Sequence, residues 1–175
     1  MTNPFAAFDA DPTFDAPEAH EAHDHQDMRG RLATAADAVQ FMTAGRATVT
    51  LVSKKTSQRF TYRLGATEDK STIFVSVLTG SDNESDYSYL GRIASGPSGR
   101  IFWAGRKVPR PGDVGRDAPS SKAFAWTWQN LVRGTLPEQL EVWHEGRCGR
   151  CGRKLTVPQS VAQGFGPECV QHVHS

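Results

Sequence analysis

The 175-residue chain has no long hydrophobic run. A helix that spans a bilayer needs about 20 consecutive apolar residues, and no stretch of this sequence approaches that length. The start of the chain also lacks the basic and apolar regions of a secretory signal peptide. We therefore expect a cytoplasmic protein without a membrane partner.

Lysine and arginine are missing from the first 28 residues, which carry seven aspartates and glutamates. Residues 1–30 show no apolar periodicity, so we expect them to form a disordered acidic tail. Subtracting these seven from the 19 acidic residues leaves 12 against 20 basic ones, so the remaining chain carries a net +8. A basic body behind an acidic tail favours a nucleic-acid partner, because a flexible anionic segment can suppress nonspecific binding.

The sequence also lacks the common signatures of catalytic sites. It has no glycine motif that binds phosphates, no nucleophile elbow and no pair of carboxylates with metal-ligand spacing. We therefore expect no enzymatic activity and no small-molecule substrate.

Cysteine is scarce, with three residues in all, and this odd number fits a disulfide framework poorly. Cys148 and Cys151 form a Cys-x-x-Cys motif, and Gly149 and Gly152 give its turn the required freedom. Such a turn holds one tetrahedral metal ion in zinc ribbons and treble clefs. With Cys169 as a third ligand, the sequence predicts a structural Zn²⁺ site in a ribbon-like or treble-clef-like knuckle.

Two histidines could supply the fourth ligand. His172 follows Cys169 by three residues, and His144 precedes Cys148 by four. Spacing alone slightly favours His172, since residues three apart share one face of a helical turn. A catalytic zinc would need an open coordination position beside a general base. The His-x-Glu and Pro-Cys-x-x-Cys pattern of zinc deaminases is absent, which favours a structural role.

Between the tail and the cysteines, the pattern predicts an α+β domain over residues 31–143, with a zinc-binding module at residues 144–175 packed on it. Thr34 with Asp37 resembles a helix N-cap, and Ser120 or Ser121 could cap a second helix that ends near Val132. Segments rich in β-branched and aromatic residues predict a mostly antiparallel sheet of about five strands. These segments are residues 47–53, 59–64, 72–79, 87–93 and 100–104, and a short turn and strand at 136–143 leads into the cysteines.

Basic residues gather in two stretches that could contact phosphates. Around the cysteines these are Arg147, Arg150, Arg153 and Lys154, and further upstream they are Arg106, Lys107 and Arg110. The upstream stretch adjoins Phe102 and Trp103, and aromatic faces beside positive charge suit single-stranded DNA or RNA. The alternative is a solvated basic face with one of these two rings in the core.

A second hypothesis is a protein-interaction factor, such as an inhibitor of a host protein. Residues 78–89 would be its recognition loop, with acids at Asp82, Glu84 and Asp86. A polar connection between two strands is the simpler interpretation of this segment.

The C-terminal segment carries the pattern His-x3-Cys-x2-Cys-Gly-Arg-x-Leu-Thr-x-Pro-x-Ser over residues 144–160 and Gly-x-Gly-Pro-x-Cys over residues 164–169. This pattern resembles an uncharacterised zinc-domain family of bacteriophage and prophage proteins. Upstream stretches resemble the β-rich domain that accompanies it, so that the resemblance covers about residues 41–170. The resemblance implies a phage setting, and with it a location in the host cell cytoplasm, but it carries no known activity. It also makes His144 rather than His172 the expected fourth ligand.

Overall fold

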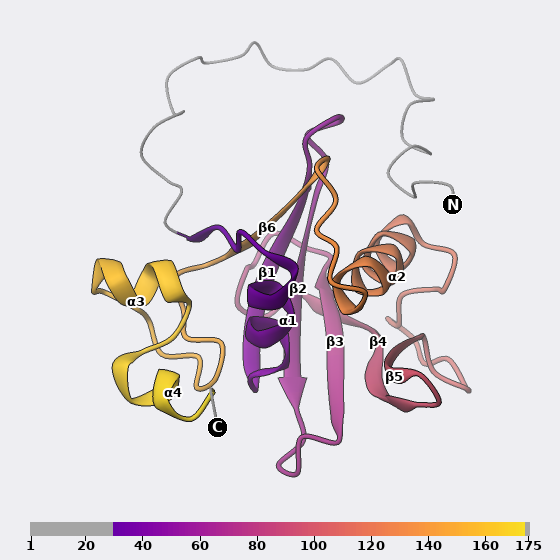
Figure 1. The fold of residues 1–175 in the computed structure, drawn as a ribbon. Helices are drawn as coiled ribbons and strands as arrows, with labels where there is room; N and C mark the ends of the chain where they lie inside the picture. Colours follow the sequence, from indigo (N-terminus) through magenta and orange to yellow (C-terminus); the bar gives the residue numbers. More distant parts are fainter. Residues whose placement is uncertain (1–29, 174–175) are drawn as a thin grey trace.

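A computed structural model describes residues 30–173 of the chain, so the expected acidic tail lies almost wholly outside the described residues. Six strands form one sheet in the order β5-β4-β3-β2-β1-β6, and every neighbouring pair is antiparallel. Figure 1 shows α1 and α2 over the same face of this sheet. The predicted α+β class and mostly antiparallel sheet are confirmed.

Helix α1 spans Ala35–Thr43 and begins where the sequence predicted. The Asp37 backbone N–H donates to Oγ1 of Thr34 at 3.1 Å, and the Thr34 hydroxyl donates to Asp37 at 2.7 Å. This exchange satisfies a backbone donor that the first helical turn leaves without a partner. Phe41 and Met42 point into the core, where each is about 1% exposed.

Five consecutive strands form a meander: β1 (Arg46–Ser53), β2 (Arg59–Ala66), β3 (Thr72–Leu78), β4 (Tyr87–Gly96) and β5 (Gly99–Ala104). The inward side chains of β3 are Ile73, Val75 and Val77, whereas Phe74 between them is exposed. Since side chains alternate across a strand, Phe74 lies on the face opposite the helices. The sheet therefore has one face in the core and an opposite face that no helix within residues 30–173 covers, which we call the open face.

The sixth strand corrects the expected count of about five. Strand β6, Leu140–His144, does not continue the meander but pairs with β1, so that Val49 lies opposite His144. Pairing here satisfies the backbone groups that β1 would otherwise expose at the sheet edge. It also places the cysteine segment at the edge opposite β5.

Helix α2, Pro119–Val132, has Ala118 as its N-cap, so the expected caps Ser120 and Ser121 are wrong. Pro119 suits the first turn because proline has no backbone N–H to leave without a partner. The predicted stripe of Phe124, Trp128 and Leu131 is buried.

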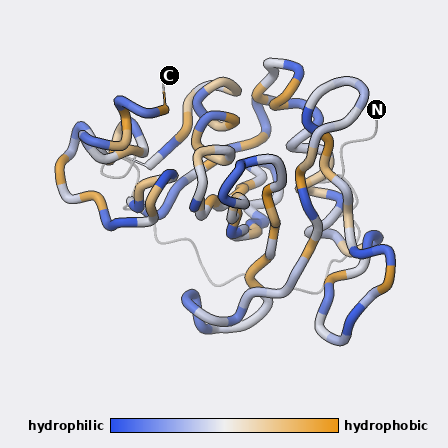
Figure 2. The backbone as a smooth tube through the Cα atoms, turned by 90° about the horizontal axis from the view of Figure 1, so that it is seen from below, coloured by the Kyte–Doolittle hydropathy of each residue, from blue (hydrophilic) through white to orange (hydrophobic). Residues whose placement is uncertain are grey.

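Two short helices complete the chain, α3 (Pro158–Gln163) and α4 (Pro167–Gln171). They lie beside α1 and β6 in Figure 1. Cys148, Phe165 and Cys169 belong to the same buried cluster as Phe41 and the sheet residues. Figure 2 shows hydrophilic residues gathered in the outer loops. No helix within residues 30–173 has the length and apolar character needed to cross a membrane.

Candidate functional site

The three cysteines come together at the edge of the sheet beyond β6. Cys148 and Cys151 lie in the turn that follows β6, and Cys169 lies in the first turn of α4. Their sulfur atoms lie within 4.8 Å of one another. Zinc–sulfur bonds of about 2.3 Å separate tetrahedral ligands by about 3.8 Å, so a small closure would give bonding distances. The cluster could hold a metal ion.

Backbone hydrogen bonds shape the turn around the first two cysteines. The Cys148 N–H donates to the Arg153 carbonyl at 2.8 Å, and the Gly152 N–H donates to the Cys148 carbonyl at 2.8 Å. An antiparallel backbone β-bridge between Arg147 and Lys154 closes this small hairpin. We call residues 147–154 the knuckle.

The electrostatics of the cluster fit a bound cation. Burial raises the pKa of the Cys148 thiol, but N–H groups of Gly166, Cys151 and Arg150 donate to its sulfur and bring the pKa below its ordinary value. Burial and the two neighbouring cysteines raise the pKa of Cys169, which Arg150 only partly offsets. Three thiolates this close together would repel one another, and a metal ion bound between them would remove that repulsion.

His144 does not join the cysteines, which differs from its expected role as fourth ligand. Its Nδ1 accepts from the Gly146 N–H at 3.0 Å, so Nε2 carries the proton and donates to the Val161 carbonyl at 2.8 Å. The ring stacks on Phe41 at 5.0 Å between centroids. Burial lowers the pKa of His144, which fits a neutral ring. Both ring nitrogens are thus engaged in backbone hydrogen bonds.

His172 does not join the cluster either. It is the C-cap residue of α4 and is exposed. Among the described residues, neither histidine lies within 4.8 Å of all three sulfur atoms. The three cysteines alone make up the cluster in this part of the chain.

The knuckle packs closely against α1 and the start of β1. A Cβ atom on Gly149 would lie 2.8 Å from the Phe41 ring, and one on Gly45 would lie 2.8 Å from the Arg150 carbonyl oxygen. The Arg46 N–H donates to the Gly149 carbonyl at 2.7 Å. The knuckle is therefore continuous with the main core.

The basic residues of the knuckle are partly engaged within the chain. Arg147 forms an ion pair with Glu84 at 3.4 Å, and Nη1 of Arg150 lies 3.9 Å from the sulfur of Cys169. Arg153 and Lys154 line a cavity of about 240 Å³ together with the three cysteines. Two of the four knuckle cations thus have partners inside the fold.

The candidate recognition loop between β3 and β4 folds back on the sheet. Arg63 donates to the carbonyl oxygens of Glu84 at 2.9 Å and Asn83 at 3.3 Å. Asp82 accepts from the Glu84 N–H and from the Ser85 hydroxyl, each at 2.8 Å. Internal bonds therefore occupy much of the acidic loop.

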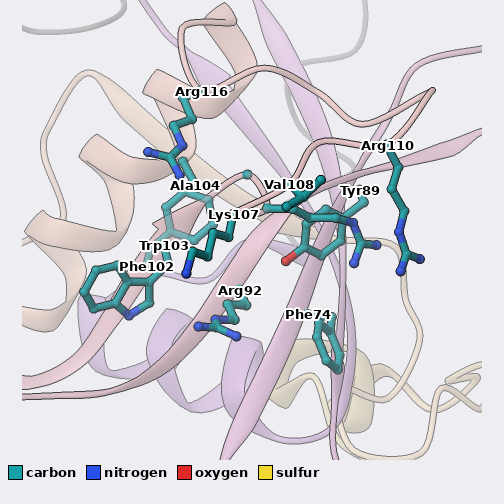
Figure 3. Close-up of a pocket in the computed structure, with 12 residues that line it drawn as sticks. Phe74, Tyr89, Arg92, Phe102, Trp103, Ala104, Lys107, Val108, Arg110 and Arg116 are labelled. Atoms are coloured by element: carbon teal, nitrogen blue, oxygen red, sulfur yellow. The ribbon is translucent and has the colours of Figure 1, made fainter.

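A second hollow lies beside β5, with a volume of about 850 Å³ (Figure 3). Its lining includes five cationic residues and four aromatic ones, and no acid. The cations are Arg92, Arg106, Lys107, Arg110 and Arg116, and the aromatics are Phe74, Tyr89, Phe102 and Trp103. We call this hollow the basic hollow.

One cation of the basic hollow is fixed in place. The guanidinium of Arg106 lies 3.9 Å from the centroid of the Tyr89 ring and 3.0 Å from a carboxylate oxygen of Asp113. No ion pair within residues 30–173 involves Arg92, Lys107, Arg110 or Arg116. Most of the positive charge here faces solvent.

The structure keeps the two predicted basic stretches apart. The knuckle follows β6, whereas the loop with Arg106, Lys107 and Arg110 follows β5, at the opposite edge of the sheet. The basic hollow also includes Phe74, Tyr89 and Arg92, which the sequence did not indicate as nucleic-acid contacts. The signal for Phe74 was available, because the apolar alternation of β3 points its ring outward.

Residues 140–174 match the model of a family of unknown function (DUF6011). The match begins at β6 and includes all three cysteines. No curated protein and no solved structure matches the chain. The family description names no activity, and residues 41–139 lie outside the match.

Proposed function

We propose that this chain is a zinc-binding accessory protein of the phage type that its C-terminal segment resembles, and that it binds nucleic acid without catalysing a reaction. The observation that carries the proposal is the basic hollow, whose lining includes five cationic side chains and four aromatic rings but no acid, although Asp113 pairs with Arg106 beside it. Phosphate contacts by lysine and arginine provide most of the affinity of such proteins.

The zinc ion has a structural role in this proposal. Cys148, Cys151 and Cys169 would hold it, with the knuckle and the first turn of α4 arranged as in a treble clef. When bound, the ion neutralises the three thiolates and joins the knuckle to α4. The fit rests on the sulfur spacing and on the N–H groups that point at Cys148. Three ligands come from these cysteines, and the expected fourth ligand, His144, would have to exchange its hydrogen bond to Gly146 or Val161 for the metal.

The basic hollow is a better phosphate-binding surface than the knuckle. Lys107 and Arg110 are exposed and lie on one loop, whereas Arg147 is paired with Glu84. A carboxylate beside an arginine partly neutralises the positive charge that a phosphate would meet. We therefore assign the main contacts to the basic hollow and a smaller share to Arg153 and Lys154.

Two matched charge reversals test this assignment. The full-length zinc-loaded protein is titrated into labelled DNA and RNA at several salt concentrations, alongside the variants Lys107→Glu/Arg110→Glu and Arg153→Glu/Lys154→Glu. The first variant should bind at least about ten-fold more weakly, with a salt slope lower by about 1 to 2. The second should lose less.

The opposite ranking of the two variants would move the site to the knuckle. Absence of salt-dependent binding to both DNA and RNA at micromolar protein would refute the function itself. If a host protein instead copurifies with the chain after nuclease and high-salt treatment, the protein-interaction hypothesis replaces it.

A further inference from the structure

Three side chains form a row across the open face of the sheet. In the strand register, Phe74 of β3 lies opposite Arg92 of β4, and Arg92 lies opposite Trp103 of β5. Strands are about 4.8 Å apart, so the two aromatic residues lie about 10 Å apart with an arginine between them. Figure 3 shows this order, with the Arg92 guanidinium between the Phe74 and Trp103 rings.

Both aromatic rings of the row are exposed to an unusual degree. Phe74 is 46% exposed and Trp103 is 50% exposed, whereas Phe102, beside Trp103, packs against Phe124 on the helix-covered face. On the other side of Phe74, the register places Gly65, and a Cβ there would have no atom within 4 Å. Exposed apolar side chains that lie together within a polar rim mark interaction surfaces.

The charges around the row define which ligand fits. Arg92 lies within it, and Lys107 and Arg110 lie on the adjoining loop of the basic hollow. The neighbouring part of the open face carries the acidic loop, where Glu84 pairs with Arg147 and accepts from Arg63. An anionic chain is therefore attracted to the row, where the cations have no acid among the lining residues, more than to the mixed charges beside β1 and β2.

We infer that this row is a binding site for single-stranded nucleic acid, with unpaired bases stacked on Phe74 and Trp103 and phosphates on Arg92, Lys107 and Arg110. The inference rests on the proposed function and restricts the ligand from nucleic acid in general to single strands. A duplex hides the faces of its bases in its own stack, so it gains phosphate contacts here but none from the rings. Single-stranded DNA and RNA share the required chemistry.

The test compares three labelled probes with the full-length, zinc-loaded protein: oligothymidine and oligouridine of about 12 nucleotides, and a DNA duplex of equal length. Phe74→Ala and Trp103→Ala remove a ring, and Trp103→Phe keeps one. Val132→Ala is the matched control, because Val132 is an exposed apolar residue, 47% exposed, on α2. Circular dichroism verifies that each variant is folded.

We expect wild type to bind at least one single strand more tightly than the duplex. Each alanine variant should bind that strand about ten-fold or more weakly, with duplex binding unchanged. Trp103→Phe should keep the affinity but lose the part of the tryptophan fluorescence quenching that the strand causes at Trp103. Val132→Ala should behave like wild type.

If the alanine variants bind single strands as wild type does while salt-dependent binding persists, the stacking site is wrong and the proposed function stands. Equal wild-type affinity for duplex and single strands leads to the same conclusion. If the alanine variants lose duplex binding and single-strand binding together, the stacking site is also wrong. The substitutions then act through a general effect on the structure. No binding to any probe overturns the proposed function as well.

Discussion

His144 joins two parts of the protein through hydrogen bonds of its ring. It belongs to β6, yet its ring bonds reach Gly146 at the start of the cysteine segment and Val161 on α3. Its stacking on Phe41 adds a contact with α1. A buried polar group with all of its bonds satisfied fixes the relative position of its neighbours.

The variant His144→Ala should retain its metal but lose stability. The Gly146 N–H would lose its acceptor, whereas the Val161 carbonyl keeps the Gly164 N–H at 3.2 Å, so we expect a loss of about 1 to 3 kcal/mol in total. Zinc content per folded chain should stay near that of wild type, and urea should unfold the variant at a lower concentration. A variant that folds but binds no zinc would identify His144 as a ligand after all.

Tyr62 should make the free energy of unfolding fall at alkaline pH. It is buried, its hydroxyl donates to the Ser120 carbonyl at 2.8 Å, and burial raises its pKa well above the ordinary value. Above about pH 10 the tyrosine of the unfolded chain loses its proton while that of the folded chain keeps it. The unfolded state then binds fewer protons, so the free energy of unfolding falls as pH rises.

The variant Tyr62→Phe isolates this effect. It should lose about 1 kcal/mol near pH 7, because the Ser120 carbonyl loses its donor. Its stability should then fall less steeply than that of wild type between about pH 10 and 11. Urea unfolding at several pH values measures both, and equal slopes for the two proteins would contradict the assignment.

The sequence predicted which cysteines gather at the candidate metal site, but it did not predict the hydrogen bonds of His144 beside them. Cys148 and Cys151 are local in sequence, and their spacing alone predicts a shared ion. The role of His144 depends on Val161, 17 residues away, which only the packing of α3 brings close. Short-range spacing carries no information on such a partner.

At the level of elements, the knuckle and α1 form the contact that ties the cysteine segment to the core. Gly149 lies against Phe41, so close that a methyl group would overlap the ring. Overpacked sites of this kind force side chains or backbone to move.

The variant Gly149→Ala should therefore be destabilised by about 1 to 3 kcal/mol. Gly65→Ala is the matched control, because Gly65 has open space around the added methyl group. Thermal unfolding of both variants with zinc present provides the comparison. Equal melting temperatures would show that the knuckle is not held against α1 in this way.

The sequence predicted where helices and strands lie along the chain better than which strands pair with each other. Periodicity located both main helices and five strands, because apolar alternation is a local signal. The pairing of β6 with β1 is not local, since Val49 and His144 are 95 positions apart in the sequence. The row of Phe74, Arg92 and Trp103 depends in turn on the register of three strands. Each strand was predictable, and the surface that they form together was not.

Over the whole molecule, charge is divided between an acidic N-terminal segment and a basic remainder. The seven acids of residues 1–28 carry no compensating lysine or arginine. If the basic hollow binds phosphates, an anionic segment of the same chain competes for it at a high local concentration.

Deletion of residues 1–28 should accordingly strengthen nucleic-acid binding several-fold at low salt, and the gain should shrink as salt screens the competition. A full-length variant with the seven acids changed to their amides is the matched control and should behave like the deletion. Fluorescence anisotropy at two salt concentrations measures the effect. Unchanged affinity at low salt would show that this segment does not compete.

The central claim for the molecule is that its three cysteines form one metal site. The most direct test is the zinc content of the purified full-length protein, measured by native mass spectrometry for wild type and Cys151→Ser. Cys151 is the exposed member of the cluster, so its substitution disturbs the core least. We predict one zinc ion per wild-type chain and loss of that stoichiometric zinc in the variant. A wild-type chain without zinc, or a Cys151→Ser chain that keeps it in full, would contradict the claim.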